Sequence, residues 1–378
     1  MQRKKILILV DWFYPGYKAG GPIQSCRNFV SSMEDSYELK VVTSDRDLGD
    51  DQPYSGVAIN SWNRYSASTE VFYAAALSSK QLQSLIRETA PDYIYINSLF
   101  SYRFAIMPLM LKRMGKIDAK IVLAPRGMLK QSALKYKATK KKIFLRLFRL
   151  LQIHHGLHFH ATDAAELTDI INKMGKSAIA TLIPNFPGVQ QTFREPLKKS
   201  QGALAVIFVG RIHAIKNLAY ILACLQPVTA IVNFTIVAAV EDEQYWQRCK
   251  HIIEKLPRNI SVHMKNDVPH HNMESLLQQH DLFVLPTKGE NFGHAIFESL
   301  AAGRPVLISD QTPWTNLASH KAGWDIPLNT PEIFTEVMET VAAMTEKEHL
   351  LWCKGAWTYC HDFIEQSKIK EQYIKLFS

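Results

Sequence analysis

The chain is a series of short, continuously apolar runs separated by amphipathic segments of helical length. Runs that are apolar throughout, rather than alternating, predict strands buried on both faces, as in a parallel sheet. The segments between them predict helices that cover those sheets. The predicted strands are 6–10, 39–43, 92–97, 120–125 and 178–184 in the first half, and 203–209, 233–240, 259–264, 281–286 and 305–309 in the second. The pattern predicts an α/β protein with two parallel sheets.

One polar stretch, REPLKKSQG (194–202), interrupts this alternation with proline, glycine and charge, and the strand pattern restarts at Ala203. A chain of 378 residues is long enough for two domains that each have their own core. We therefore predict an N-terminal domain over 1–197 and a C-terminal domain over 198–356.

The stretch PTKGENFGHAIFESLAAGRP (286–305) predicts a strand end, a glycine-containing turn and a helix that ends near Gly303. Backbone N–H groups at such a helix start attract anions. Glu290 falls in the turn, and Glu298 follows about two helical turns later, roughly 12 Å along the chain. This spacing suits a ligand with a phosphate in its middle and hydroxyls at both ends, such as a nucleotide sugar.

Two cations follow another predicted strand, in VGRIHAIKNL (209–218). The Arg211 side chain would emerge at the carboxyl end of the strand, where open α/β sheets bind ligands, and Lys216 precedes a predicted helix. A diphosphate needs positive charge to be held and to be stabilised as it leaves. The alternative interpretation is that both are ordinary surface cations.

Gly20 and Gly21 precede Pro22 between the first predicted strand and the first helix. Adjacent glycines let the backbone approach a ligand closely, although a plain flexible turn is the alternative. No G-x-G-x-x-G fingerprint is present, which argues against a nicotinamide-dependent enzyme.

Five motifs, in this order, resemble those of glycosyltransferase family 4, a retaining family with the GT-B fold. The motifs are YKAGGP (17–22), APRGML (124–129), IPNFPG (183–188), VGRIHAIKNL (209–218) and the E-x7-E stretch, which contains ENFG and leads into AAGRPVLISDQTPW. Together they span nearly the whole chain, which makes the match far more specific than one glutamate pair. Within that family the chain resembles bacterial transferases that build surface polysaccharides.

The resemblance implies two Rossmann-like domains with parallel sheets facing across a cleft, and a last helix, 357–378, that returns to the N-terminal domain. It implies retaining transfer of a sugar from a UDP- or GDP-sugar to a saccharide acceptor, expected to be lipid-linked, in polysaccharide or lipopolysaccharide synthesis. No cofactor is expected. The alternatives are a GT-B-fold sugar-nucleotide epimerase and a non-catalytic basic scaffold.

The resemblance also implies roles for single residues. Arg211 and Lys216 clamp the donor diphosphate and stabilise its developing charge. Glu290 positions the transferred sugar, and Glu298 accepts from the ribose hydroxyls. The other donor-binding candidates are Gly20, Gly21, Asn291, Phe292 and Gly293. A diphosphate oxygen would take the acceptor proton, so no enzymic nucleophile is required.

The chain departs from the family at one place, because many members carry a histidine where this chain has APRGML. Arg126 occupies that neighbourhood, and Arg126 and Asn97, each at a predicted strand end, are acceptor-side candidates. His160, in HATDAAE beside a helix N-cap signal, is a catalytic candidate. The alternative is that it belongs to a polar loop and core-edge group of histidines.

Two acidic patterns resemble metal or ligand sites. Asp45 and Asp47 form a D-x-D, which we interpret as a solvated acidic loop rather than a metal–nucleotide signature. Glu241, Asp242 and Glu243 predict the acidic first turn of a helix. We therefore expect no required metal.

The segment 130–150 holds eight Lys or Arg residues and no acid, in a chain whose net charge is +9. On a helix, Lys135, Lys142, Arg146 and Arg149 form one stripe, with apolar residues on the other faces. This pattern predicts a basic amphipathic helix that contacts an anionic membrane surface. A helix packed on the sheet with solvated lysines is the alternative, and nucleic acid is disfavoured because no aromatic stacking motif accompanies the charge.

The five cysteines are scattered and form no C-x-x-C, so neither a disulfide framework nor a zinc site is predicted. No stretch approaches the ~20 apolar residues of a membrane-spanning helix. The initial run ILILV is too short for a signal peptide and lacks a cleavage site. These features favour a cytoplasmic protein, with peripheral binding to the inner face of the membrane as an added expectation.

Overall fold

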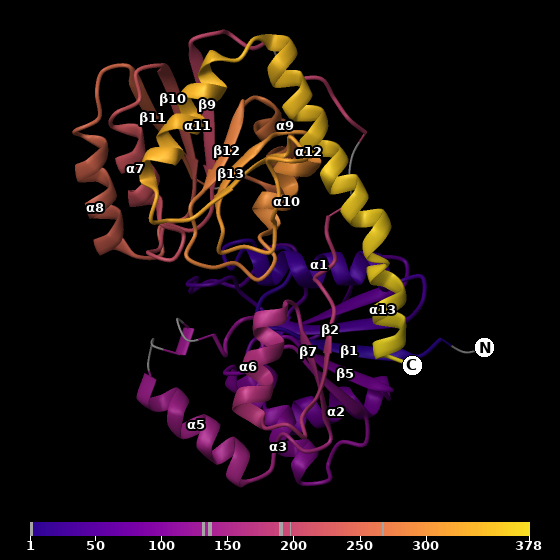
Figure 1. Cartoon of the computed structure of the whole chain (residues 1–378). Helices are drawn as coiled ribbons and strands as arrows, with labels where there is room; N and C mark the ends of the chain where they lie inside the picture. The colour runs from indigo at the N-terminus through magenta and orange to yellow at the C-terminus, as the bar shows by residue number, and fades with distance from the viewer. Residues whose placement is uncertain (1–2, 131–132, 135–137, 189–191, 197, 267) are drawn as a thin grey trace. The chain divides into compact units, whose positions relative to one another are not determined.

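The computed structural model describes residues 3–378 except 131–132, 135–137, 189–191, 197 and 267 (Figure 1). The chain divides into two compact units, Met1–Phe186 with Lys368–Ser378 and Pro187–Ser367, which we call the N-terminal and C-terminal units. Each has its own parallel sheet and its own apolar core, so the predicted α/β class with two Rossmann-like domains is confirmed.

The sheet of the N-terminal unit has the strand order β3-β4-β2-β1-β5-β6-β7-β8, and its neighbours are parallel except for β3 and β4. The strands are β1 (Lys5–Leu9), β2 (Glu38–Ser44), β3 (Trp62–Arg64), β4 (Thr69–Ala74), β5 (Tyr93–Ile96), β6 (Lys120–Leu123), β7 (Leu157–Ala161) and β8 (Ile179–Leu182). The helices are α1 (Gly21–Met33), α2 (Ser79–Thr89), α3 (Met107–Arg113) with a π-helical turn before it (Tyr102–Ile106), α5 (Ala138–Leu150), α6 (Ala164–Met174) and α13 (Ile369–Leu376).

The sheet of the C-terminal unit has the order β11-β10-β9-β12-β13-β14 and is parallel throughout its described residues. The strands are β9 (Ala203–Val209), β10 (Ile231–Val237), β11 (Ile260–Lys265), β12 (Leu282–Leu285), β13 (Val306–Ser309) and β14 (Gly323–Ile326). The helices are α7 (Leu218–Leu225), α8 (Glu243–Ile253), α9 (His270–Gln278), α10 (His294–Ala301), α11 (Pro331–Ala343) and α12 (Glu346–Ser367).

The strand order reverses at β9, which lies between β10 and β12, and in the N-terminal unit at β1, which lies between β2 and β5. Loops that leave neighbouring strands at such a point turn in opposite directions and open a crevice at the carboxyl edge of the sheet. The two reversals therefore mark candidate ligand-binding edges, one in each unit.

Four strands have no counterpart among the predicted apolar runs, namely β3, β4, β7 and β14. Polar residues interrupt them: β4 contains Glu70, and β7 carries His158 and His160 among its apolar residues. Their pairing with neighbouring strands, rather than a continuous apolar sequence, decides their conformation.

The last helix, α13, completes the core of the N-terminal unit. It follows Lys368, whose φ of 44° ends α12. The buried Tyr373 ring stacks on Phe186 at 4.5 Å between centroids and packs against Phe29 at 5.3 Å. Lys370 pairs with Asp35 at 2.5 Å. Residues 368–378 are thus an integral part of this unit.

We expect Tyr373→Ala to destabilise the N-terminal unit by about 3–5 kcal/mol, because it leaves a cavity among aromatic rings. Ile374→Ala is the matched control, since Ile374 lies next to it on α13 with its side chain exposed. Urea unfolding of both variants measures the difference in free energy. Equal losses in the two variants would contradict the packing described for Tyr373.

Candidate functional site

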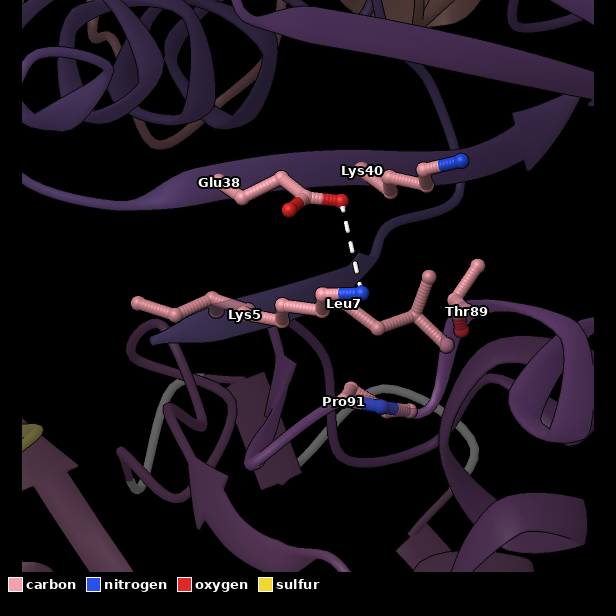
Figure 2. A pocket seen from close by; sticks show the side chains of 7 residues that line it. Lys5, Leu7, Glu38, Lys40, Thr89 and Pro91 are labelled. Atoms are coloured by element: carbon pink, nitrogen blue, oxygen red, sulfur yellow. Dashed lines mark ion pairs between the residues drawn. The ribbon is translucent and has the colours of Figure 1, made fainter. Parts of the chain in front are cut away.

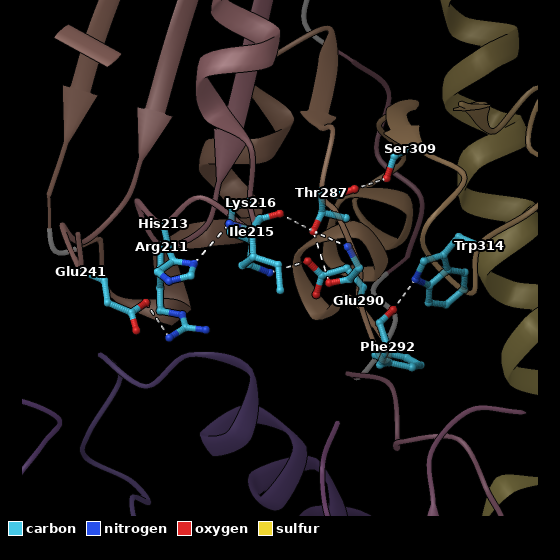
Figure 3. Close-up of polar contacts among 11 residues, drawn as sticks. Arg211, His213, Ile215, Lys216, Glu241, Thr287, Glu290, Phe292, Ser309 and Trp314 are labelled. Atoms are coloured by element: carbon cyan, nitrogen blue, oxygen red, sulfur yellow. Dashed lines mark hydrogen bonds and ion pairs between the residues drawn. The ribbon is translucent and has the colours of Figure 1, made fainter. Parts of the chain in front are cut away.

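In the C-terminal unit the loops after β9 and β12 bind to each other through their backbones. The carbonyl of Ile215 accepts from the Lys288 amide at 2.8 Å and from the Thr287 hydroxyl at 3.1 Å. Ser309, at the end of β13, donates to the Thr287 carbonyl at 2.5 Å (Figure 3). Three strand ends at the point of reversal are therefore fixed relative to one another.

An ion pair joins the same two loops through their side chains. Lys216 Nζ lies 2.5 Å from Glu290 Oε1, and the two side chains are only 19% and 11% exposed (Figure 3). Asn217 after it takes a left-handed φ of 60° and begins α7. The structure thus brings together two residues that the sequence predicts as donor ligands from positions 74 apart.

The second predicted cation, Arg211, pairs with Glu241 at 2.7 Å (Figure 3). Both side chains are more than a third exposed, at 37% and 39%. An ion pair this exposed contributes little stability, so an anionic ligand can replace Glu241 at low cost. The acidic turn is confirmed in part: Asp242 caps α8, accepting from the Tyr245 amide at 3.0 Å, whereas Glu241 binds Arg211.

The predicted turn and helix of the E-x7-E stretch are present, with α10 starting directly after Gly293. Gly293 has φ 76°, and a Cβ there would lie 2.9 Å from Ile296 Cδ1. The turn is held by Trp314, which donates to the Phe292 carbonyl at 2.5 Å (Figure 3). The Glu290 amide also donates to the Gln311 carbonyl at 3.0 Å. Among the described residues no side chain caps the start of α10. The backbone amides at a helix start attract anions, so this end of α10 is a candidate anion-binding position.

The remaining donor candidates of this unit lie on the same turn and helix. Asn291 and Glu298 are half-buried, whereas the Phe292 ring is buried and packs against Trp314 at 5.2 Å. Phe292 therefore offers its backbone, not its ring, to a ligand. Glu298 lies in the second turn of α10, as the sequence predicts.

In the N-terminal unit, Gly20 precedes α1 with φ 65° and Gly21 is the first, exposed residue of that helix. The loop before them is held by Asp47, whose carboxylate accepts from the Tyr17 amide at 2.6 Å and the Lys18 amide at 2.9 Å. The interpretation of Asp45 and Asp47 as a solvated loop is wrong, because both are buried. Asp47 instead fixes the shape of the glycine loop.

Arg126 and Asn97 lie at the carboxyl ends of β6 and β5 and bind each other. Arg126 Nε donates to Asn97 Oδ1 at 3.0 Å, and further donors of the guanidinium bind Tyr95 Oη at 2.9 Å and Asn185 Oδ1. Arg126 also has φ 55°, an uncommon conformation for a bulky residue, of the kind found at functional sites.

His160 lies at 0% exposure on β7. Its Nδ1 is 2.7 Å from Tyr95 Oη and its Nε2 is 2.8 Å from the Ile183 carbonyl, so both ring nitrogens are occupied. Burial, with the neighbouring charge of Arg126, lowers the pKa of His160 to about 3. These surroundings give the ring a structural part in the core and leave it no exposed atom for a substrate.

The sequence interpretation missed the contacts of two side chains at these edges. Asp11 follows β1, where it accepts from Ser101 Oγ at 2.6 Å, and burial raises the pKa of its carboxyl. Glu241 is the partner of Arg211. Asp11 could have been found from the sequence, because it is a carboxylate directly after a buried strand. No sequence pattern links Glu241 to Arg211, which lies 30 positions earlier.

A small hollow occupies the opposite, amino edge of the N-terminal sheet (Figure 2). It is lined by the ends of β1 and β2, including Lys5 and Glu38, whose charged groups are 3.8 Å apart. Its volume is about 10 Å³, room for one water molecule at most. It offers no ligand site.

Within the described residues there is no cluster of three or more side chains suited to a metal ion. The five cysteines are buried free thiols. None of the described helices combines the length and apolarity that crossing a bilayer requires.

Residues 189–351 match the family model described as "Glycosyl transferases group 1". This range holds Arg211, Lys216 and the whole E-x7-E stretch, and the match supports a glycosyltransferase. No curated protein sequence matches the chain.

Several solved structures are similar over nearly the full length. Sucrose-phosphate synthase from Thermosynechococcus elongatus has a TM-score of 0.78 at 13% identity, covering 99% of this chain and 98% of that one. HepE from Anabaena, in complex with UDP and glucose, has a TM-score of 0.68 at 15% identity with 99% of each chain covered. WaaG, a glycosyltransferase involved in lipopolysaccharide biosynthesis, has 0.68 at 14% identity, again with 99% of each. At these identities the likeness shows the fold, which is GT-B.

We expect His160→Gln to flatten the acid dependence of stability. The folded-state pKa of about 3 lies below the ordinary value of 6.5, so the unfolded chain binds a proton that the folded chain rejects. The stabilisation is therefore complete above pH 6.5 and is lost as the pH falls towards 3, with a slope of at most about 1.4 kcal/mol per pH unit.

Urea titrations between pH 7 and 4 measure this slope, and His251→Gln on the exposed surface is the control. A structural role also predicts that His160→Gln keeps its turnover once folded. Parallel pH profiles for wild type and His160→Gln would contradict the assignment.

Proposed function

We propose that the protein is a retaining glycosyltransferase that moves a sugar from a UDP- or GDP-sugar to a saccharide acceptor. The observation that carries the proposal is the arrangement at the carboxyl ends of β9 and β12. At this edge of the sheet lie Arg211 with its partner Glu241, Lys216 with its partner Glu290, and the start of α10, which no side chain caps among the described residues. The family match on 189–351 supports the same assignment.

Donor binding begins as an exchange of ion pairs. The diphosphate replaces Glu241 as the partner of Arg211 and Glu290 as the partner of Lys216, while the first-turn amides of α10 bind a phosphate oxygen. The Glu290 carboxylate, released from Lys216, then accepts from hydroxyls of the transferred sugar. Glu298 accepts from the ribose hydroxyls.

The chemical step needs no nucleophile from the protein. The acceptor hydroxyl attacks the anomeric carbon from the side of the leaving group, and the bond from that carbon to the diphosphate oxygen breaks. A diphosphate oxygen takes the hydroxyl proton, so the products are the new glycoside and a nucleoside diphosphate. Arg211 and Lys216 stabilise the charge that develops on the leaving group.

On the N-terminal unit we assign the Gly20–Gly21 loop to the donor phosphate or the acceptor, and Arg126 with Asn97 to the acceptor. Asp47 and Asn185 hold these groups in place before a ligand arrives. We further propose that the acceptor is a lipid-linked saccharide and that the product enters surface polysaccharide or lipopolysaccharide synthesis. A similar structure, WaaG, is a glycosyltransferase of lipopolysaccharide biosynthesis.

The cation pair provides the main test. Arg211→Ala and Lys216→Ala should each weaken binding of UDP or GDP at least tenfold, because each removes a charge-assisted contact worth about 1.5–3 kcal/mol. Glu241→Gln should leave affinity unchanged or raise it, since it removes a competitor for Arg211. Calorimetry measures all three, and Arg248→Ala on the exposed face of α8 is the control. Unchanged affinity in both alanine variants would refute the assignment.

Substitution of the two glutamates should affect nucleotide binding and turnover differently. Glu298→Gln should weaken binding of the free nucleoside diphosphate, because its partner, the ribose, is present there. Glu290→Gln should leave that affinity nearly intact or slightly higher, since Lys216 loses its competing carboxylate, yet it should lower kcat with the donor sugar. Calorimetry and initial rates on both variants test this. A loss of nucleotide affinity in Glu290→Gln as large as in Glu298→Gln would reverse the roles.

A further inference from the structure

The outer face of α5 exposes an apolar stripe. Ile143, Leu147 and Leu150 are 52%, 47% and 77% exposed, and they are spaced i, i+4 and i+7, so they share one side of the helix. Leu151, directly after the helix, is exposed as well. Isolated exposed leucines are ordinary on a protein surface, but an aligned set on one helix face marks an interaction surface.

The opposite face of α5 holds the helix on the N-terminal unit. Phe148 is buried, and Phe144 packs edge-on against Phe100 at 5.4 Å. Lys141 lies over the Phe100 ring at 5.0 Å and donates to the Ala133 carbonyl at 2.7 Å. The helix cannot turn its exposed stripe inward without breaking these contacts, so the stripe stays on the surface.

Cations border the stripe on both sides. At 100° per residue, Lys140 lies on one flank and Arg146 on the other, with Lys142 and Arg149 beyond Arg146. All four side chains are exposed, and within the described residues none of them forms an ion pair. Lys135, which the sequence places in line with Lys142, Arg146 and Arg149, lies outside the described residues.

We infer that the outer face of α5 docks on an anionic lipid bilayer. Ile143, Leu147 and Leu150 would enter the boundary of the acyl chains, and the flanking cations would contact anionic headgroups. The charge favours a membrane as the partner. An apolar stripe flanked by Lys140 on one side and by Arg146, Lys142 and Arg149 on the other matches a surface with an apolar interior and negative headgroups. Phe144 and Phe148, whose rings are packed inward, take no part. The inference concerns the N-terminal unit and does not depend on the proposed glycosyltransferase activity.

Co-sedimentation of the full chain with vesicles tests the charge and the stripe separately. We expect binding to vesicles of phosphatidylcholine with 30% phosphatidylglycerol, and at least tenfold weaker binding to phosphatidylcholine alone or at high salt. Lys140→Gln/Lys142→Gln/Arg146→Gln and, separately, Leu147→Ser/Leu150→Ser should each weaken binding about tenfold or more.

The matched controls are substitutions of exposed residues in the C-terminal unit. Lys255→Gln/Lys347→Gln/Lys354→Gln controls for the loss of charge. Leu351→Ser controls for the loss of exposed leucines, because Leu351 is 52% exposed. These should bind as wild type does. Because every substituted side chain is exposed, thermal melting should be unchanged in all variants. Equal binding to neutral vesicles, no loss in the α5 variants, or equal loss in the controls would overturn the proposal.

A second measurement reports insertion directly. The five native cysteines are buried, so Leu150→Cys provides a selectively labelled site for an environment-sensitive fluorophore. We expect a blue shift on anionic vesicles for the label at Leu150→Cys and none for Leu351→Cys. An unchanged spectrum at both positions would show that the stripe does not enter the bilayer.

Discussion

The ion pair between Lys216 and Glu290 holds together the edge of the sheet on which the candidate site depends. At 2.5 Å, and with both side chains largely buried, it links the loop after β9 to the loop after β12. The backbone bonds to Ile215 support the same junction. Removal of either partner would leave a poorly solvated charge, which costs more than an exposed pair contributes. The pair thus keeps a cation and a carboxylate in position in the absence of a ligand.

The second pair, Arg211 with Glu241, differs from the first in being exposed to solvent. Both side chains are more than a third exposed, so this pair contributes little stability, and the proposed exchange of Glu241 for a diphosphate would cost little. For the proposed donor site, the two ion pairs would balance the charge of the empty edge. Displacement of both carboxylates would then leave Arg211 and Lys216 for the diphosphate. Ordering cations in advance reduces the entropic cost of binding.

The N-terminal unit uses buried polar groups to fix its own strand ends. Tyr95 links His160 on β7 to Arg126 after β6, and Asn185 extends the network beyond β8. Tyr373 from α13 closes it, with its ring 5.2 Å from that of His160. A satisfied network of this kind specifies one arrangement of the core, which explains why His160 is neutral and enclosed. The exposed face of α5 has no such neighbours, and its outward leucines remain available.

The sequence by itself determined the two parallel sheets and the helix that follows Gly293. It also determined that Arg211, Lys216 and Glu290 lie in loops after strands and that Glu298 lies on that helix. Continuous apolar runs, glycine and charge are local signals, and they can be recognised without knowledge of which distant residues come into contact. Only the tertiary structure decided the burial of Asp47, the pairing of Arg211 with Glu241 and the enclosure of His160. The same holds for β4 and β7, which are strands because of their neighbours. Each of these outcomes depends on residues distant in the chain, whose proximity follows from strand order rather than from any local pattern.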